Sequence, residues 1–173
     1  MALAILSVAA AGSARMFSLA VVANGRARAQ TLTTMLAMQK LEELRALSWC
    51  VRPGPPAVPE SDTSTDLAQS SPASGVTGLG TSPAGSLDRN MPGYVDYLDR
   101  TGAWVGTGTT PPSAALFVRR WSVAGLPGDD FNTLVLQVRV MSVAADVARA
   151  AVGSHPRLPG DTSLAVVRTR VSR

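Results

Sequence analysis

Hydrophobic and polar positions first mark out a long N-terminal segment, 1–49. It is apolar from Met1 to Ala23 and two-faced from Gln30 to Leu47, with no helix breaker before Pro53. Ala, Leu, Met, Gln, Glu, Lys and Arg dominate the two-faced stretch, and all of them are good helix formers. The pattern therefore predicts a single helix from near the N-terminus to about Trp49, roughly 70 Å long at about 1.5 Å per residue.

The two ends of this predicted helix suit different surroundings. Residues 1–23 are suited to a membrane or a bundle of like helices, whereas residues 24–49 are amphipathic, with polar side chains between apolar ones that recur every third position. Leu36 widens the apolar side. We predict that this side forms half of a hydrophobic core, through Leu32, Met35, Met38, Leu41, Leu44 and Leu47.

The segment 50–90 has a different character. It is rich in Pro, Ser, Thr and Gly, and no helical or strand period survives there. We interpret it as a partly extended connector that packs in places through Leu67, Val76 and Leu79. Long loops of this kind are functional or mobile. One interpretation is a solvated linker with no specific partner, and the resemblance given below would instead make the connector a surface that sets partner choice.

From residue 91 to 173 the period changes to two, which predicts strands. A turn at Asp99–Gly102 separates the first two, and Pro127-Gly128-Asp129-Asp130 predicts an antiparallel return between the two longest. The clearest strand has its apolar face at Leu134, Leu136, Val138 and Val140. The predicted strands are Tyr94–Leu98, Ala103–Val105, Ala115–Val123, Thr133–Val143 and Leu164–Val171.

These elements predict an α+β fold. Alternation along the strands indicates an antiparallel sheet with one buried face and one wetter face. The only long apolar stripe available to cover the buried face is that of the helix, Leu32–Leu47. We therefore expect the C-terminal half of a long N-terminal α-helix to pack on a small antiparallel β-sheet.

Two runs of the predicted helix resemble a known family. Ala2-Leu3-Ala4-Ile5-Leu6-Ser7 is similar to the middle of the N-terminal segment of type IV pilins and pseudopilins. Leu36-Ala37-Met38-Gln39-Lys40-Leu41-Glu42-Glu43-Leu44-Arg45-Ala46-Leu47 resembles the end of the same helix in minor pilins and type II secretion pseudopilins. Arg119-Arg120-Trp121 and the hairpin that follows further resemble their head domains. The resemblance implies a pilin-like fold.

The chain also departs from that family at its start. The basic leader, the Gly-Phe processing site and the glutamate near the mature N-terminus are absent from the sequence. We expect that the chain begins late, at an internal methionine, because restoring about seven residues would give the apolar run the roughly 20 residues that span a bilayer. An in-frame leader in the DNA upstream of Met1 would test this expectation.

The resemblance implies a structural subunit of a type IV pilus or a type II secretion-like filament. Its partners would be other pilin or pseudopilin subunits, the inner-membrane assembly machinery and, before assembly, membrane lipid. The head would be periplasmic and the subunit would then enter the filament. Small residues allow helices to approach closely, and Arg15 would have to snorkel or pair with an acidic group on a neighbouring subunit. The predicted assembly residues are Ala9, Ala10, Ala11, Gly12, Ser13 and Arg15.

Composition argues against several other classes of function. With one Cys, one His and no nucleophile, phosphate-loop or metal motif, the chain is expected to be no enzyme and to hold no cofactor. The arginines that give the net charge of +4 are scattered along the chain, which argues against a nucleic-acid-binding surface. We expect Cys50 to be a small buried residue and His155 an exposed loop residue.

Two alternatives stay open at this point. Asp129, Asp130 and Asn132 could hold calcium, although they offer fewer oxygen atoms than the six to eight that calcium takes, and a hairpin turn explains the same residues. The competing class of protein is a single-pass membrane-anchored or secreted periplasmic binding module. In that case the helix is only a tether, which has no need to be a continuous rod.

Overall fold

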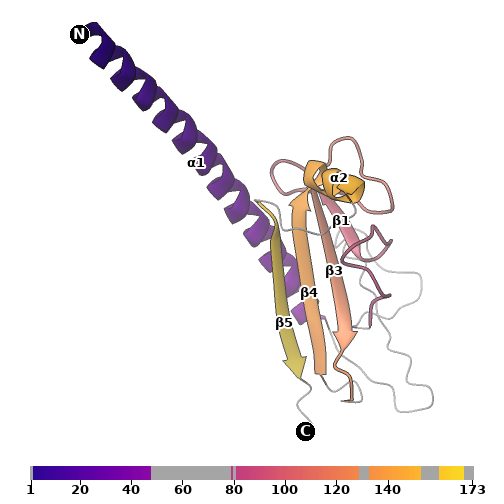
Figure 1. Ribbon diagram of the computed structural model, residues 1–173. Helices are drawn as coiled ribbons and strands as arrows, with labels where there is room; N and C mark the ends of the chain where they lie inside the picture. Colours follow the sequence, from indigo (N-terminus) through magenta and orange to yellow (C-terminus); the bar gives the residue numbers. More distant parts are fainter. Residues whose placement is uncertain (1, 48–78, 80, 129–132, 153–159, 170–173) are drawn as a thin grey trace, which may run out of the picture.

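The N-terminal helix, α1, runs without interruption from Ala2 to Ala46 and extends far beyond the rest of the molecule (Figure 1). The structure is a computed structural model that describes residues 2–47, 79, 81–128, 133–152 and 160–169, with side chains described from residue 12 onward. The 45 residues of α1 make a rod about 68 Å long. This confirms the predicted long helix; Ser48 and Trp49 lie outside the described residues.

The remainder of the described chain forms an antiparallel sheet and one short helix. The sheet has five strands in the order β2-β1-β3-β4-β5. Every predicted strand is present, with its ends shifted by at most two residues. In the long β3–β4 pair and in the β4–β5 pair, strands that are neighbours in the sheet are also consecutive strands of the chain. The bounds are β1 Val95–Leu98, β2 Trp104–Gly106, β3 Phe117–Gly125, β4 Thr133–Ser142 and β5 Thr162–Thr169.

The C-terminal half of α1 packs across one face of this sheet and forms the main core. On the sheet side, the predicted apolar face of β4 is fully buried: Leu134, Leu136, Val138 and Val140 are all 2% exposed or less. Leu41 and Leu44 of α1 are buried against it, with Leu32 and Leu47 partly buried at the edges. The helix-on-sheet arrangement that the sequence predicts is therefore present.

Two predicted core residues lie outside this core. Met35 and Met38 are 62% and 56% exposed, so their assignment to the core was wrong. The side of α1 that faces the sheet instead carries Thr33, Leu36, Ala37, Lys40, Leu41 and Leu44, all buried. These positions follow the pattern i, i+3, i+4, i+7, i+8, i+11, which keeps them on one side of a helix with 3.6 residues per turn.

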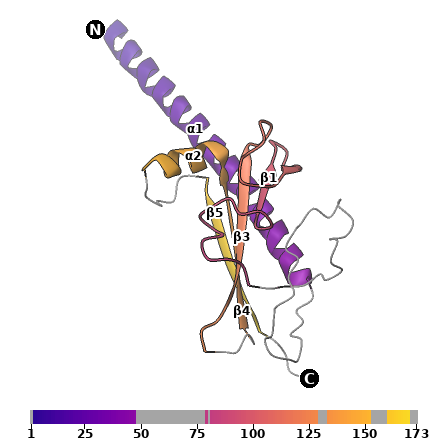
Figure 2. The same cartoon turned by 90° about the vertical axis from the view of Figure 1, so that its right-hand side faces the viewer.

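The opposite face of the sheet carries a second, smaller cluster. Val95, Tyr97, Ala115, Val118 and Met141 are buried there, although we expected this face to be wetter. Part of the cover comes from α2, Val143–Val152, a helix that the sequence analysis did not predict. Figure 2 shows α2 and the C-terminal part of α1 on opposite sides of the sheet.

Local signals explain why the chain turns from strand to helix at this point. The Ser142 hydroxyl accepts a hydrogen bond from the Ala145 amide at 3.1 Å, which is the geometry of a helix N-cap. The segment that follows is rich in alanine, and its Asp146 and Arg149 suit the first and last turns of a helix. The predicted strand Thr133–Val143 therefore ends one residue early.

The buried side of β5 is the side that includes an arginine, whereas the uncharged side of the strand is exposed. Leu164 and Val166 pack against the main core, and Arg168 of the same side donates a hydrogen bond to the Leu47 carbonyl at 2.8 Å. Val167, on the other side, is 61% exposed. Arg168 is tolerated on the covered side because its guanidinium satisfies a carbonyl at the C-terminal end of α1.

The predicted turn at Asp99–Gly102 is confirmed and also positions the helix. The Asp99 carboxylate accepts hydrogen bonds from the Thr101 hydroxyl at 2.7 Å and from the amides of Ala103 and Thr101 at 2.9 and 2.7 Å, and these bonds lower its pKa. Gly102 has a φ of 86°, and a Cβ there would lie 2.8 Å from a methyl carbon of Leu36. Glycine is therefore required both by the turn and by the close approach of α1.

Of the connector, residues 79 and 81–90 belong to the described part of the chain. Leu79 is 1% exposed in the main core, which confirms one predicted contact, while Leu67 and Val76 lie outside the described residues. Ser82 pairs with the backbone of Val123, donating from its amide at 2.8 Å and accepting at its hydroxyl at 3.0 Å. The end of the connector is thus attached to the free edge of β3.

Candidate functional site

The N-terminal half of α1 projects away from the sheet, and we call residues 12–28 the stem. Every side chain of the stem is exposed. It contains large apolar side chains that are between 48% and 74% exposed: Met16, Phe17, Leu19, Val21 and Val22. Nothing among the described residues covers them, so the stem presents apolar surface that a partner could bury.

The apolar side chains lie all round the stem. Successive residues of an α-helix are about 100° apart, so Met16, Phe17 and Leu19 point in three different directions. A helix that is apolar on every side is typical of one surrounded by other helices or by lipid, whereas a stripe is typical of one that lies on a single surface. The stem is therefore suited to contacts on several sides at once.

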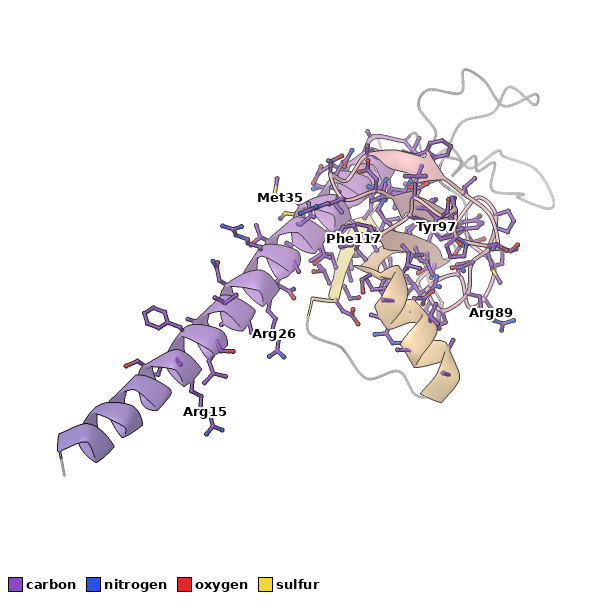
Figure 3. The ribbon with its side chains drawn as sticks, turned by 90° about the horizontal axis from the view of Figure 1, so that it is seen from above. Arg15, Arg26, Met35, Arg89, Tyr97 and Phe117 are labelled. Carbon is purple, nitrogen blue, oxygen red and sulfur yellow. The ribbon has the colours of Figure 1, made fainter. Side chains whose placement is uncertain are left out.

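The charges of the stem are all positive. It carries Arg15, Arg26 and Arg28, and the first acidic residue of the chain is Glu42. Arg15 and Arg26 are eleven positions apart, about three helical turns, so both project from the side of α1 that carries the head, whereas Met35 points away from it (Figure 3). The stem itself therefore offers no acidic partner to these arginines.

The predicted assembly residues can be placed only in part. Gly12, Ser13 and Arg15 are exposed on the stem, while the side chains of Ala9, Ala10 and Ala11 lie outside those described. A Cβ placed on Gly12 or on Gly25 would meet nothing within 4 Å, so the stem surface is open at both glycines. Within the described part of α1, no window combines the length and mean apolarity of a membrane span.

At the junction of α1 and the sheet, charged side chains form a buried cluster. Lys40 of α1, the only lysine, has no exposed surface, and its Nζ lies 3.0 Å from Oδ2 of Asp96 in β1. Arg119 of β3 donates to the same oxygen through Nε at 3.2 Å and Nη2 at 2.8 Å. Its Nη1 donates to the Leu36 carbonyl at 3.1 Å. One carboxylate therefore holds two cations from two elements.

Aromatic and acidic neighbours complete the cluster. Lys40 Nζ lies 3.6 Å from the centre of the Trp121 ring, a cation–π geometry. Trp104 Nε1 donates to Oδ1 of Asp96 at 3.3 Å, and a Glu43 oxygen lies 3.6 Å from Lys40 Nζ. Each charge thus faces an opposite charge or a ring, which is the condition under which buried ions are tolerated.

Burial lowers the pKa of Lys40 to about 8, against 10.5 for an ordinary lysine. Desolvation is the largest cause; the nearby Arg119 also lowers the pKa, while Asp96 and Glu43 raise it again. A lysine with such a pKa resembles a nucleophile or general base, but Lys40 has no exposed surface that a substrate could reach. The cluster therefore fixes the helix to the sheet.

Sequence reasoning missed this cluster, although signals for it existed. Arg119 alternates with Phe117, Trp121 and Val123 on one strand face, which is the face that α1 covers. Lys40 lies between the apolar positions Ala37 and Leu44 of α1, and Asp96 follows a buried strand residue. A charged residue in each of three elements that face one another indicates that the charges are buried together. The strand order is needed to know that these three elements lie side by side.

The other chemical candidates from the sequence lie elsewhere. Cys50, His155 and the possible calcium ligands Asp129, Asp130 and Asn132 are outside the described residues. In the part of the chain that the structure describes, no three His, Cys, Asp or Glu side chains gather in a way that could hold a metal ion.

Comparison with known proteins adds no assignment. No family model, no curated protein and no solved structure matches this chain. The fold therefore defines a class only: an α+β protein in which a long N-terminal helix is exposed over residues 12–28 and lays its C-terminal part on a five-stranded antiparallel sheet.

Proposed function

We propose that this chain is a minor pilin or pseudopilin, a non-enzymatic subunit of a type IV pilus or a type II secretion-like filament. The observation that carries the proposal is the stem, in which large apolar residues such as Phe17 and Val21 are exposed on several sides of a continuous helix. The resemblance of residues 2–7 and 36–47 to the helix of these families supports it. A pilin-like fold, with α1 on the sheet, is part of the same proposal.

In this proposal the stem packs among the helices of neighbouring subunits. Small residues such as Gly12 and Gly25, which have open space around them, allow those helices to approach closely. The head remains on the filament surface. Before assembly the subunit resides in the bacterial inner membrane with its head in the periplasm, and the assembly machinery there is its first partner.

Arg15 gives the proposal its specific chemistry. Its side chain is exposed on a stem without acidic residues, so its partner in a filament is a carboxylate of a neighbouring subunit. A guanidinium left without a partner among apolar helices would cost several kcal/mol. Arg15 therefore favours only those neighbouring subunits that place a carboxylate beside it in the filament.

The test is fractionation of cells that express the tagged chain in the organism that encodes it. We expect the chain in the filament fraction released by shearing. Arg15→Leu should leave insertion into the membrane intact but reduce the filament-bound fraction several-fold. Arg45→Leu is the matched control, since Arg45 is exposed on the half of α1 that carries the head and pairs there with Glu42 at 2.9 Å.

The outcomes separate the two classes of function. A chain that stays in the membrane or the periplasm, in cells that do assemble filaments, would contradict the proposal and favour the anchored or secreted binding module. Equal incorporation of wild type, Arg15→Leu and Arg45→Leu would leave filament membership standing and remove the proposed role of Arg15.

A further inference from the structure

A cavity of about 410 Å³ opens on the face of the sheet that α1 does not cover. Its walls come from the turn at 88–90, the loop after β2, strand β3 and helix α2. This volume is within the range of small-ligand sites, and it is far more than a single ion needs. The lining residues are Asp88, Arg89, Asn90, Thr109, Arg120, Asp146, Arg149 and Ala150.

Arg120 is a buried charged side chain in the wall of this cavity, and hydrogen bonds fix its position. Its side chain is 4% exposed, and it donates to the Asn90 side-chain oxygen through Nε at 2.9 Å and Nη2 at 2.6 Å. Nη2 also donates to the carboxylate of Asp146. Asn90 is held in turn by the Thr109 carbonyl at 3.2 Å. Arg120 is therefore fixed from two sides, while its Nη1 makes no hydrogen bond to any described residue.

The charges around the cavity do not cancel. Asp146 pairs with Arg120, and Asp88 pairs with Arg139 of β4 at 2.8 Å. Arg149 is paired with Asp161. Arg89 is exposed and has no ion pair with the described residues; Figure 3 shows it at the outer rim of the head, on the far side from α1. One positive charge is left over at the mouth of the cavity.

We propose that this cavity binds a carboxylate group, held between Arg89 at the mouth and Nη1 of Arg120 on the floor. Guanidinium groups bind carboxylates through paired N–H donors. A single negative charge balances the one uncompensated arginine. A doubly charged phosphate is disfavoured, because it would add a second negative charge beside Asp88 and Asp146.

The volume places the carboxylate at the end of a larger group. Two sources have this chemistry: the free C-terminus of a peptide, and a small organic acid. The site is independent of the stem, on the opposite face of the sheet from α1, so it stands or falls separately from the proposed role in a filament.

The test is titration of the full chain at low ionic strength, monitored by calorimetry. The probes are acetyl-Ala-Ala-Ala with a free carboxylate, the same peptide with a C-terminal amide, acetate, and inorganic phosphate. We expect the free-acid peptide to bind at least tenfold more tightly than the amide and than phosphate. Acetate binding as tightly as the peptide would support the site and assign it to small acids.

Variants tie the binding to the cavity. Arg89→Gln removes the mouth cation from an exposed position and should weaken binding of the free-acid peptide about tenfold or more, with an unchanged melting temperature. Arg100→Gln makes the same change at the exposed β1–β2 turn and should leave the affinity unaltered. If Arg89→Gln unfolds the chain, Arg89→Lys serves in its place and should bind more weakly than wild type.

Three results would overturn the proposal. They are no binding of the free-acid peptide or acetate, equal binding of the acid and amide peptides, and equal weakening by Arg89→Gln and Arg100→Gln. Tighter binding of phosphate than of any carboxylate would also reject it, because the cavity would then recognise a different anion.

Discussion

At the scale of single residues, the junction between α1 and the sheet depends on one carboxylate. Asp96 is 2% exposed and accepts hydrogen bonds from Lys40, Arg119 and Trp104. Removing ions from water costs several kcal/mol each, and that cost is offset only while every partner is present. The cluster is therefore more important for the position of the helix than for the total stability of the fold.

Asp96→Asn tests this dependence. It leaves Lys40 and Arg119 without their shared carboxylate, and we expect a loss of about 3–5 kcal/mol in the free energy of unfolding. The loss is limited because Lys40, with its pKa already lowered to about 8, can release its proton. Urea denaturation at neutral pH measures it.

The matched control is Asp88→Asn, the same chemical change in a pair with Arg139 whose side chains are 45% and 27% exposed. An exposed pair contributes at most about 1 kcal/mol, so the control should be close to wild type. Equal destabilisation by the two variants would contradict the special role of Asp96.

The lowered pKa of Lys40 also predicts how stability depends on pH. Between about pH 8 and pH 10.5 the unfolded chain keeps a proton on Lys40 that the folded chain has released. The unfolded state therefore binds more protons, and the free energy of unfolding should rise with pH in this window, by up to about 3 kcal/mol. The group faces Asp96, Glu43 and Arg119, so its titration reports on the whole cluster.

The measurement is urea unfolding at about pH 8, 8.5 and 9. Staying below pH 10 avoids Tyr97, whose pKa is raised by burial and whose folded form would hold its proton longer than the unfolded form. Lys40→Met should remove the Lys40 contribution and flatten the rise. A rise of the same size in Lys40→Met would assign it to other groups.

At the scale of elements, the sequence pattern located α1 and the strands well, but it assigned the wrong side of α1 to the core. The stripe Met35, Met38, Leu41, Leu44, Leu47 has a period of three, which drifts by about 60° per step and sweeps most of the way round a helix over four steps. Only its later members can face the sheet. The true face needs spacings of three and four in alternation, and it includes a threonine and a lysine that a search for apolar residues passes over.

Leu36→Ala against Met35→Ala tests the orientation of α1. Leu36 is 6% exposed and packs in the main core beside Gly102, whereas Met35 is 62% exposed. Removing the buried side chain should cost about 2–4 kcal/mol, and removing the exposed one less than about 0.5 kcal/mol. Equal costs in urea denaturation would place both residues in similar surroundings and contradict this orientation.

The second face of the sheet shows what strand patterns leave out. Arg120 and Arg139 point to that face, and their alternation with apolar residues predicted an open, wet surface. Instead α2 and the turn at 83–90 bring Asp146, Asn90 and Asp88 to these arginines. The partners are 26 to 51 positions away in the chain, so no local pattern reports them. The cavity was therefore not predictable, whereas the strands that form its floor were.

At the scale of the whole molecule, the two parts of α1 differ in what stabilises them. Residues 33–44 are stabilised by the sheet, while the side chains of the stem are all exposed. An isolated helix of this length is only marginally stable in water, because helix formation is cooperative and its nucleation is costly. The stem should therefore fray locally in the free subunit although the head stays folded.

Hydrogen exchange measured on the dilute monomer tests this difference. We expect amides of the stem to exchange at least a hundredfold faster than those of residues 33–44, which open only with much of the head. If the chain enters a filament as we propose, the stem should become as slow there as the packed half, because neighbouring helices would bury Phe17 and Val21 on several sides. Equal protection of both halves in the monomer would mean that the stem is stable alone. Unchanged exchange on assembly would mean that neighbours do not contact the stem.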